Sequence, residues 1–106
     1  MNYTGKLKNK FSKYYIEMNA LPLVAEFFGT FLLLMSIFVT GNAFVIGGTL
    51  GLIVLLLGGV SGAHVNPAVS VAMLLKGAIS TTDLVTYTVA QCAGAAAAWY
   101  AYKTLA

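Results

Sequence analysis

The stretch from Ser61 to Ser70, SGAHVNPAVS, places a histidine, an asparagine and a proline in the middle of a very apolar chain. An apolar run precedes it and a second, shorter apolar run follows it. Asparagine is a good helix N-cap, and proline fits the first helical position because the N–H that it lacks has no partner there. The stretch therefore predicts that one helix stops before it and that another begins at Asn66 and Pro67.

The composition favours a lipid environment. Of the 106 residues, 59% are hydrophobic and only 8% are charged, and large exposed apolar patches make a soluble domain associate. Four of the six lysines, Lys6, Lys8, Lys10 and Lys13, lie in the first 13 residues. This basic head suits an anionic membrane surface, whereas the rest of the chain offers no basic face to nucleic acid. The single cysteine excludes an internal disulfide. We therefore expect one all-α domain whose partner is the lipid bilayer.

Apolar runs predict three full spans and one half span. The spans are expected at about residues 21–40, 43–60 and 83–104. Each has close to the ~20 residues that cross a hydrocarbon core. The helix at about residues 66–76 is only about 15 Å long at 1.5 Å per residue, which is half a membrane. Residues 21–106 would form this membrane domain.

The lysines predict how the N-terminal segment and the spans are placed. Residues 1–20 are expected to form a basic interfacial segment, with a short helix over residues 5–18 lying at headgroup level. With the N-terminus in the cytoplasm, five of the six lysines face the cytoplasm and only Lys103 faces out. Because basic residues concentrate on the cytoplasmic side, we expect a cytoplasmic N-terminus.

A helix that begins halfway through a bilayer needs a special environment. Non-helical backbone at membrane depth is tolerated only where it is buried in protein or lines a watery cavity. The helix start carries roughly half a positive charge, which repels cations and orients the oxygen of a water molecule toward it. The carbonyls of residues 62–65 would accept the hydrogens of that water. The break therefore suggests a wet cavity at mid-depth.

Three motifs together resemble the aquaporin, or major intrinsic protein, family. SGAHVNPAVS is similar to the first signature of the family, AEFFGTF at residues 25–31 to its first-helix motif, and AQCAGA at residues 90–95 to its third-helix motif. They stand in the right order and at the right separations, and cover residues 21 to about 104. The resemblance implies three transmembrane helices plus a re-entrant half-helix, which is the first of the family's two inverted repeats. It also implies a passive channel for water or small uncharged solutes rather than an enzyme, without cofactor or metal.

The resemblance further implies roles for residues at the break. The side-chain amide of Asn66 would donate to the permeating molecule. Pro67 and Ala68 would stack the half-helix against its counterpart. The pore-lining carbonyls would be those of Gly62, Ala63, His64 and Val65.

Four residues elsewhere complete the implied site. Ile46 and Leu50 would lie at the narrow filter. Ile46 stands where the family usually has an aromatic residue or histidine, so the constriction would be wider and less polar. Glu26 would be a buried acceptor that anchors the re-entrant loop, since a charge inside a span costs about 2.5–3.5 kcal/mol on insertion scales and needs partners. Gln91 would hydrogen-bond between helices.

The sequence leaves the assembly open. These 106 residues hold one N-P-A motif and no arginine for a filter, so we expect a half-channel that needs a second repeat to enclose a pore. That repeat would come from an inverted copy of the chain, which the lysine bias disfavours, or from a separate chain carrying the C-terminal half, with higher oligomers open. The alternatives are a non-conducting truncated aquaporin remnant, a dual-topology proton-coupled exporter that uses Glu26, and a small pore-forming or scaffold protein.

Overall fold

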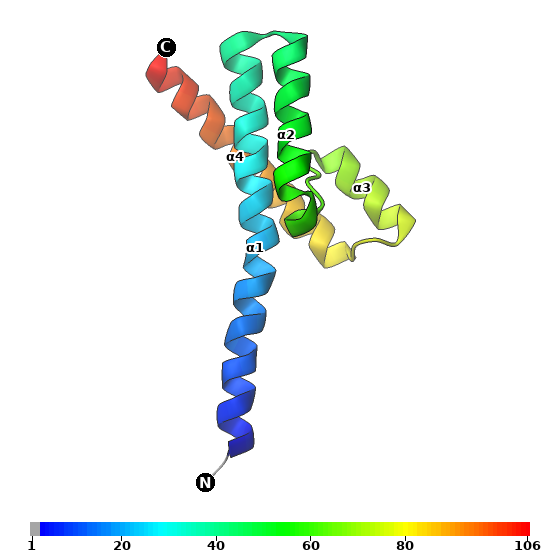
Figure 1. Ribbon diagram of the computed structural model, residues 1–106. Coiled ribbons are helices and arrows are strands. Elements are labelled where there is room, and N and C mark those ends of the chain that lie inside the picture. The colour runs from blue at the N-terminus through cyan, green and yellow to red at the C-terminus, as the bar shows by residue number, and fades with distance from the viewer. Residues whose placement is uncertain (1–2) are drawn as a thin grey trace.

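The computed structural model describes the backbone of residues 3–106 and the side chains from Ala20 onward. It is all-helical over the described residues, as predicted (Figure 1). Four helices follow one another: α1 (Tyr3–Thr40), α2 (Ala43–Ser61), α3 (Pro67–Lys76) and α4 (Thr81–Leu105). The bounds of the last three lie within a few residues of those expected.

Helix α1 is one continuous element where the sequence predicts two. Pro22 lies inside it. A proline removes one i→i−4 hydrogen bond but does not force the chain to turn. The two residues between the predicted helices are Asn19 and Ala20, and neither is a glycine that would end a helix. The first half of α1 extends well beyond the other helices (Figure 1). The side chains of the interfacial helix expected over residues 5–18 lie outside the described residues.

Short caps explain where the other helices begin and end. Gly41 has φ +55° and turns the chain after α1, and the side chain of Asn42 accepts the N–H groups of Phe44 and Val45 at 2.9 and 3.1 Å to start α2. Helix α3 ends at Gly77 in the left-handed conformation, which glycine adopts without steric cost. Ser80 and Asp83 then form a reciprocal capping box at the start of α4.

Helix α1 is the centre of the packing. It runs beside α2 as an antiparallel hairpin and is crossed by α4, while α3 packs on α4 (Figure 1). Helices α1 and α4 touch backbone to backbone at Gly94, where an added Cβ would lie 2.3 Å from the carbonyl oxygen of Phe27. At the other end of this crossing, the rings of Phe38, Trp99 and Tyr102 form one cluster, with centroids 5.6–6.2 Å apart.

Two helical segments are long and apolar enough to cross a membrane. They are Ala20–Thr40 and Ala43–Ser61. The third expected span lies in α4, which is long enough at 25 residues, but its threonine, tyrosine and glutamine residues lower its mean hydropathy. On α2, only Ile53 and Ser61 are buried, so this helix offers most of its apolar surface outward. Its glycines Gly47 and Gly51 meet nothing within 4 Å.

Candidate functional site

The segment between α2 and α3 carries three departures from ordinary backbone within four residues. Gly62 has φ +86°, Ala63 +50° and Val65 +48°. The last two are not glycines, and a β-branched residue such as Val65 is a true outlier in the left-handed region. Such residues cost of order 1–3 kcal/mol each and persist only where their surroundings hold them. The segment is therefore held by contacts elsewhere in the chain.

The carboxylate of Glu26 supplies those contacts. It is fully buried on α1. Oε2 accepts the Ser61 hydroxyl at 2.6 Å and the His64 N–H at 3.1 Å, and Oε1 accepts the Val65 N–H at 2.8 Å. These three donors belong to the end of α2 and to the segment that follows it. The structure thus shows Glu26 fixing the break between the two helices.

Gln91 on α4 joins the same carboxylate to α3. Its Nε2 donates to Glu26 Oε1 at 2.8 Å and to Ser70 Oγ at 3.1 Å. Ser70 Oγ in turn lies 2.8 Å from His64 Nδ1. All four side chains are buried, and they bring α1, α3, α4 and the segment between α2 and α3 to one point.

Tyr87 closes this network on the other side. Its hydroxyl donates to the Ser61 carbonyl at 2.8 Å, which takes up one of the orphan carbonyls at the end of α2. Its ring lies 4.9 Å from that of His64. Ser61, Ser70 and Tyr87 were not singled out from the sequence. Tyr87 precedes Gln91 by four residues and so shares its helix face, which is the signal that would have found it.

Asn66, Pro67 and Ala68 form the exposed tip of α3. Asn66 Oδ1 accepts the Ala68 N–H at 2.9 Å, so the asparagine does cap the helix as predicted. Its other polar group, the NH₂ of the side-chain amide, remains able to donate. All three residues are exposed. The tip therefore presents an amide donor, beside the positive end of a helix, to whatever lies outside the chain.

The four backbone N–H groups of residues 62–65 all have partners inside the protein. The N–H groups of Gly62, Ala63, His64 and Val65 all point into the protein, where they donate to the Gly58 carbonyl, the Ser61 hydroxyl and Glu26. Within residues 20–106, no hydrogen bond ends on the carbonyl oxygens of these four residues. Four carbonyls thus follow one another without protein partners, next to Asn66.

Ile46 and Leu50 lie far from this tip along α2. Leu50 is 39% exposed, and Ile46 is half-buried. Ile46 precedes Ser61 by 15 residues, which is about 22 Å along the helix axis at 1.5 Å per residue. The two predicted filter residues therefore occupy a different level of the molecule from the Asn66 tip.

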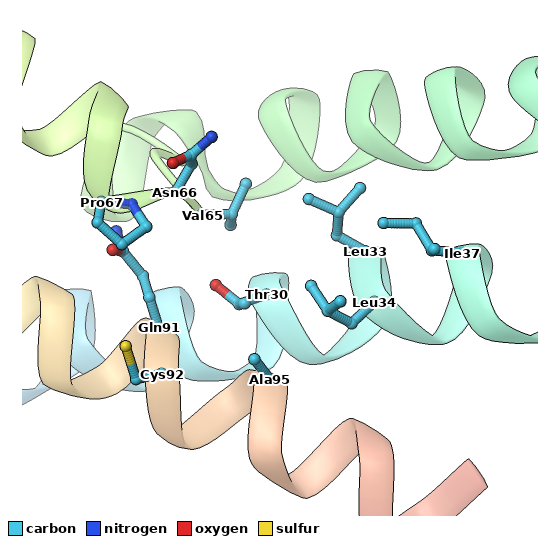
Figure 2. A pocket seen from close by; sticks show the side chains of 10 residues that line it. All are labelled: Thr30, Leu33, Leu34, Ile37, Val65, Asn66, Pro67, Gln91, Cys92 and Ala95. Atoms are coloured by element: carbon cyan, nitrogen blue, oxygen red, sulfur yellow. The ribbon is translucent and has the colours of Figure 1, made fainter.

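A pocket of about 320 Å³ lies beneath Pro67, between α1 and α4. Its apolar wall comes from Leu33, Leu34, Ile37, Val65 and Ala95. Figure 2 shows the Thr30 hydroxyl and the Gln91 amide at the end of the pocket next to Pro67, with Cys92 beside them. Thr30 Oγ1 and Gln91 Oε1 are buried and have no hydrogen-bond partner among residues 20–106.

Comparison with known proteins decides the family. The family model described as major intrinsic protein matches residues 39–105, which is more than half of the chain and includes the helix break and the Gln91 helix. The chain belongs to the major intrinsic protein family. With the two apolar helical segments, this membership indicates an integral membrane protein, and members of the family are channels rather than enzymes.

The similar proteins are named as a glycerol uptake facilitator, as aquaporins and as an aquaglyceroporin. The glycerol uptake facilitator protein-like 6 of Lactiplantibacillus plantarum is 38% identical over 90 residues, which cover 76% of this chain and 42% of that protein. Aquaporin Z of Brucella melitensis is 38% identical over 91 residues, covering 72% and 40%. An aquaglyceroporin of Rhizobium meliloti is 45% identical over 56 residues, covering 53% and 24%. The chain thus spans about two fifths of the length of the first two relatives. No solved structure gives a significant match.

The site holds no arrangement that would bind a metal ion. Among residues 20–106, no three histidine, cysteine, aspartate or glutamate side chains come together. The polar groups that do converge are one carboxylate, one amide, two serines, a tyrosine and one imidazole, and most of them bond to each other. The converging groups therefore build a rigid support, and beside it the NH₂ of Asn66 and the four carbonyls have no hydrogen-bond partner among residues 20–106.

Proposed function

We propose that this member of the major intrinsic protein family is one half of a passive channel for water or small uncharged solutes. The observation that carries the proposal is the broken helix itself. An exposed asparagine amide and four unpartnered carbonyls stand side by side at the junction of α2 and α3. An amide donor followed by a row of acceptors matches a molecule that both donates and accepts hydrogen bonds, as water and polyols do.

The electrostatics of the tip favour neutral solutes. Asn66 stands at the N-terminus of α3, where the helix dipole places partial positive charge. A cation that moved along the carbonyls of residues 62–65 would meet this charge at the tip. Glu26 does not offset it through an open cavity, since the carboxylate is fully buried and already accepts four hydrogen bonds. The site therefore suits water or a small alcohol and opposes cations.

The exposed tip supports the need for a second repeat. Asn66, Pro67 and Ala68 are open to the outside, and the buried Thr30 Oγ1 and Gln91 Oε1 lack partners. A wet cavity at membrane depth must be walled by protein, and one face cannot wall a pore. We propose that a second repeat on another chain faces this one, with Ile46 and Leu50 lining the narrow level of the pore and the N-terminus in the cytoplasm.

An osmotic assay tests conduction. The chain is reconstituted into liposomes alone, and together with the unmatched remainder of the Lactiplantibacillus plantarum relative. We expect faster shrinkage after a sucrose step, or faster re-swelling in glycerol, only where both are present, and no cation current in planar bilayers. Equal rates in loaded and empty liposomes under every condition would identify a non-conducting remnant. Proton-driven drug efflux would instead identify an exporter. The Glu26 carboxylate argues against that outcome, because it is buried and already accepts four hydrogen bonds.

A further inference from the structure

Two unfavourable choices of residue meet at one contact between α1 and the helix break. Val65 has φ +48°, a conformation that glycine adopts freely and that a β-branched residue resists. Gly29 lies in the interior of α1, where glycine is a poorer helix former than alanine. Val65 Cγ1 lies directly against Gly29, only 2.7 Å from the point where a Cβ would stand. Because neither residue suits its own backbone, the contact between them is what accounts for both.

The Val65 side chain is wedged between α1 and α2. It is 4% exposed and belongs to an apolar cluster with four other side chains, Leu33, Ile53, Leu57 and Ala63. Valine has a single side-chain torsion with few accessible rotamers, so its methyl groups cannot swing aside as the end of a leucine side chain can. A push on these methyl groups therefore moves the backbone of Val65.

Glu26 provides an opposing pull from the same helix. It precedes Gly29 by three residues, so the two residues share one face of α1. Glu26 Oε1 accepts the Val65 N–H at 2.8 Å, which draws the backbone of Val65 toward α1, while the contact with Gly29 limits how close it comes. The volume of the side chains at positions 29 and 65 thus sets the distance between α1 and this backbone.

That distance bears on what can pass along the carbonyls of residues 62–65. These carbonyls have no partner among residues 20–106, and the last of them, on Val65, adjoins Asn66. Selectivity in channels depends on the width of the passage and on the groups that line it. A Cβ on Gly29 would have to move from 2.7 Å to the ordinary contact range, which begins at 3.4 Å. A shift of several tenths of an ångström away from α1 obstructs a carbon-bearing solute more than it obstructs water.

We infer that Gly29 and the Val65 side chain together form a spacer that sets how far the four carbonyls stand out from α1. Through this spacing they determine the size of solute that the channel admits. Both are positioning residues, because they act through the backbone of the break and not by touching the solute. The inference rests on the proposed two-repeat channel and names the side chains that set its solute size.

Three variants test the spacer through the ratio of glycerol flux to water flux. Gly29→Ala pushes the segment outward, so the ratio should fall about tenfold, as for one added methylene in a binding pocket. Val65→Ala lets the segment settle toward α1 and should raise the ratio. In the double variant the new Cβ occupies the space of the lost methyl groups, so the ratio should return toward the wild-type value. A loss of folding or assembly lowers both fluxes together and leaves the ratio unchanged.

The fluxes are measured in liposomes that contain this chain and the unmatched remainder of the Lactiplantibacillus plantarum relative. Shrinkage after a sucrose step gives the water flux, and re-swelling in glycerol gives the glycerol flux. Val89→Leu is the matched control, because Val89 is 64% exposed on α4 and its enlargement should leave the ratio unchanged. If Gly29→Ala fails to fold, Val65→Ala and the double variant still test the spacer.

A second measurement needs no flux. In the ¹⁵N spectrum of this chain alone in micelles, the amide proton of residue 65 reports its hydrogen bond to Glu26. Gly29→Ala should stretch this bond, which moves the signal upfield and speeds its exchange with water. The double variant should restore a slowly exchanging signal, whereas Val89→Leu should leave the signal of residue 65 unchanged.

The outcomes separate the spacer from the proposed function. Opposite changes of the ratio in the two single variants, with recovery in the double variant, would uphold the spacer. An equal ratio in all variants, or an unchanged amide signal in Gly29→Ala, would overturn it. Absence of flux with the wild-type chain would reject the proposed channel, and with it the effect on solute size. The amide signal would then decide by itself whether Gly29 and Val65 position the break.

Discussion

Glu26 and Gln91 are joined by a hydrogen bond of 2.8 Å although 65 residues separate them in the sequence. This bond ties the first helix to the last, and the remaining bonds of the same carboxylate tie both to the segment between α2 and α3. The helix break is thus a tertiary feature. Its backbone lies in a conformation that α2 and α3 alone would not hold.

Replacing Glu26 should release the break. In Glu26→Gln one carboxylate oxygen becomes an NH₂ group, so the backbone N–H that faces it, of His64 or of Val65, loses its acceptor inside the protein. Because the site is fully buried, we expect the chain to lose about 3 kcal/mol of stability, measured as earlier unfolding in a denaturant titration in mixed micelles.

Asp83→Asn is the matched control for this change. It is the same carboxylate-to-amide substitution at an exposed capping box, and it should cost about 1 kcal/mol or less. If the two variants unfold alike, the carboxylate of Glu26 is not what holds the break.

The helix break and two of its supports, Glu26 and Gln91, were expected before the structure was known, but the other supports were not, for a physical reason. Asn66 and Pro67 act on their own helix start through local chemistry, which any segment carries with it. Ser61 and Ser70 acquire their roles only when the helices meet, and their sequence neighbours give no sign of it. Only Tyr87, which shares a helix face with Gln91, carries a local signal. The same distinction explains α1. The sequence predicts two helices there, but the chain continues through Pro22 as one helix.

The glycines show the same limit. Glycines let neighbouring membrane helices approach closely, but Gly47 and Gly51 on α2 face open space in this chain. The close approach instead occurs at Gly29, where an added Cβ would lie 2.7 Å from Val65 Cγ1, and at Gly94. Which glycine meets another helix depends on the crossing angles, and these are not encoded in a single helix.

Gly94 should therefore tolerate no side chain. In Gly94→Ala the new Cβ would lie 2.3 Å from the Phe27 carbonyl oxygen, which is backbone and cannot move aside cheaply. Helices α1 and α4 must separate, at a cost of about 1–3 kcal/mol. Gly51→Ala has the opposite expectation for the chain alone, a gain of up to about 1 kcal/mol from better helix propensity. Thermal unfolding of the two variants in detergent measures both stability changes. A Gly94→Ala variant as stable as the wild type would contradict the backbone contact.

Asn66 has two separable duties. Asn66→Ser keeps an oxygen that caps α3 but removes the amide donor, so stability should change by only a few tenths of a kcal/mol while solute flux through the assembled channel falls. Asn66→Ala removes both and should cost about 1 kcal/mol as well as flux. Osmotic rates and unfolding midpoints measured on both variants test this split. Undiminished flux in Asn66→Ser would mean that the amide does not contact the permeating molecule.

The network also predicts which nitrogen of a neutral His64 ring carries its hydrogen. Gln91 uses its two amide hydrogens on Glu26 and Ser70, so Ser70 Oγ accepts from Gln91. Since no other acceptor for the Ser70 hydroxyl is found among residues 20–106, we expect its hydrogen to point to His64 Nδ1, 2.8 Å away. Nδ1 must then accept, which leaves the hydrogen on Nε2. His64 is the only histidine in the chain, so the ¹⁵N signals of the imidazole can be assigned without ambiguity.

We expect an unprotonated Nδ1 signal for the neutral ring of the wild-type protein. Ser70→Ala removes the donor and should produce a mixture of both tautomers, whereas Ser80→Ala, at an exposed helix cap, should leave the ring unchanged. Hydrogen on Nδ1 in the wild type would mean that Ser70 accepts from both His64 and Gln91. The Ser70 hydroxyl would then have to donate to another acceptor, and the chain of donors from α4 to the helix break would have to be redrawn.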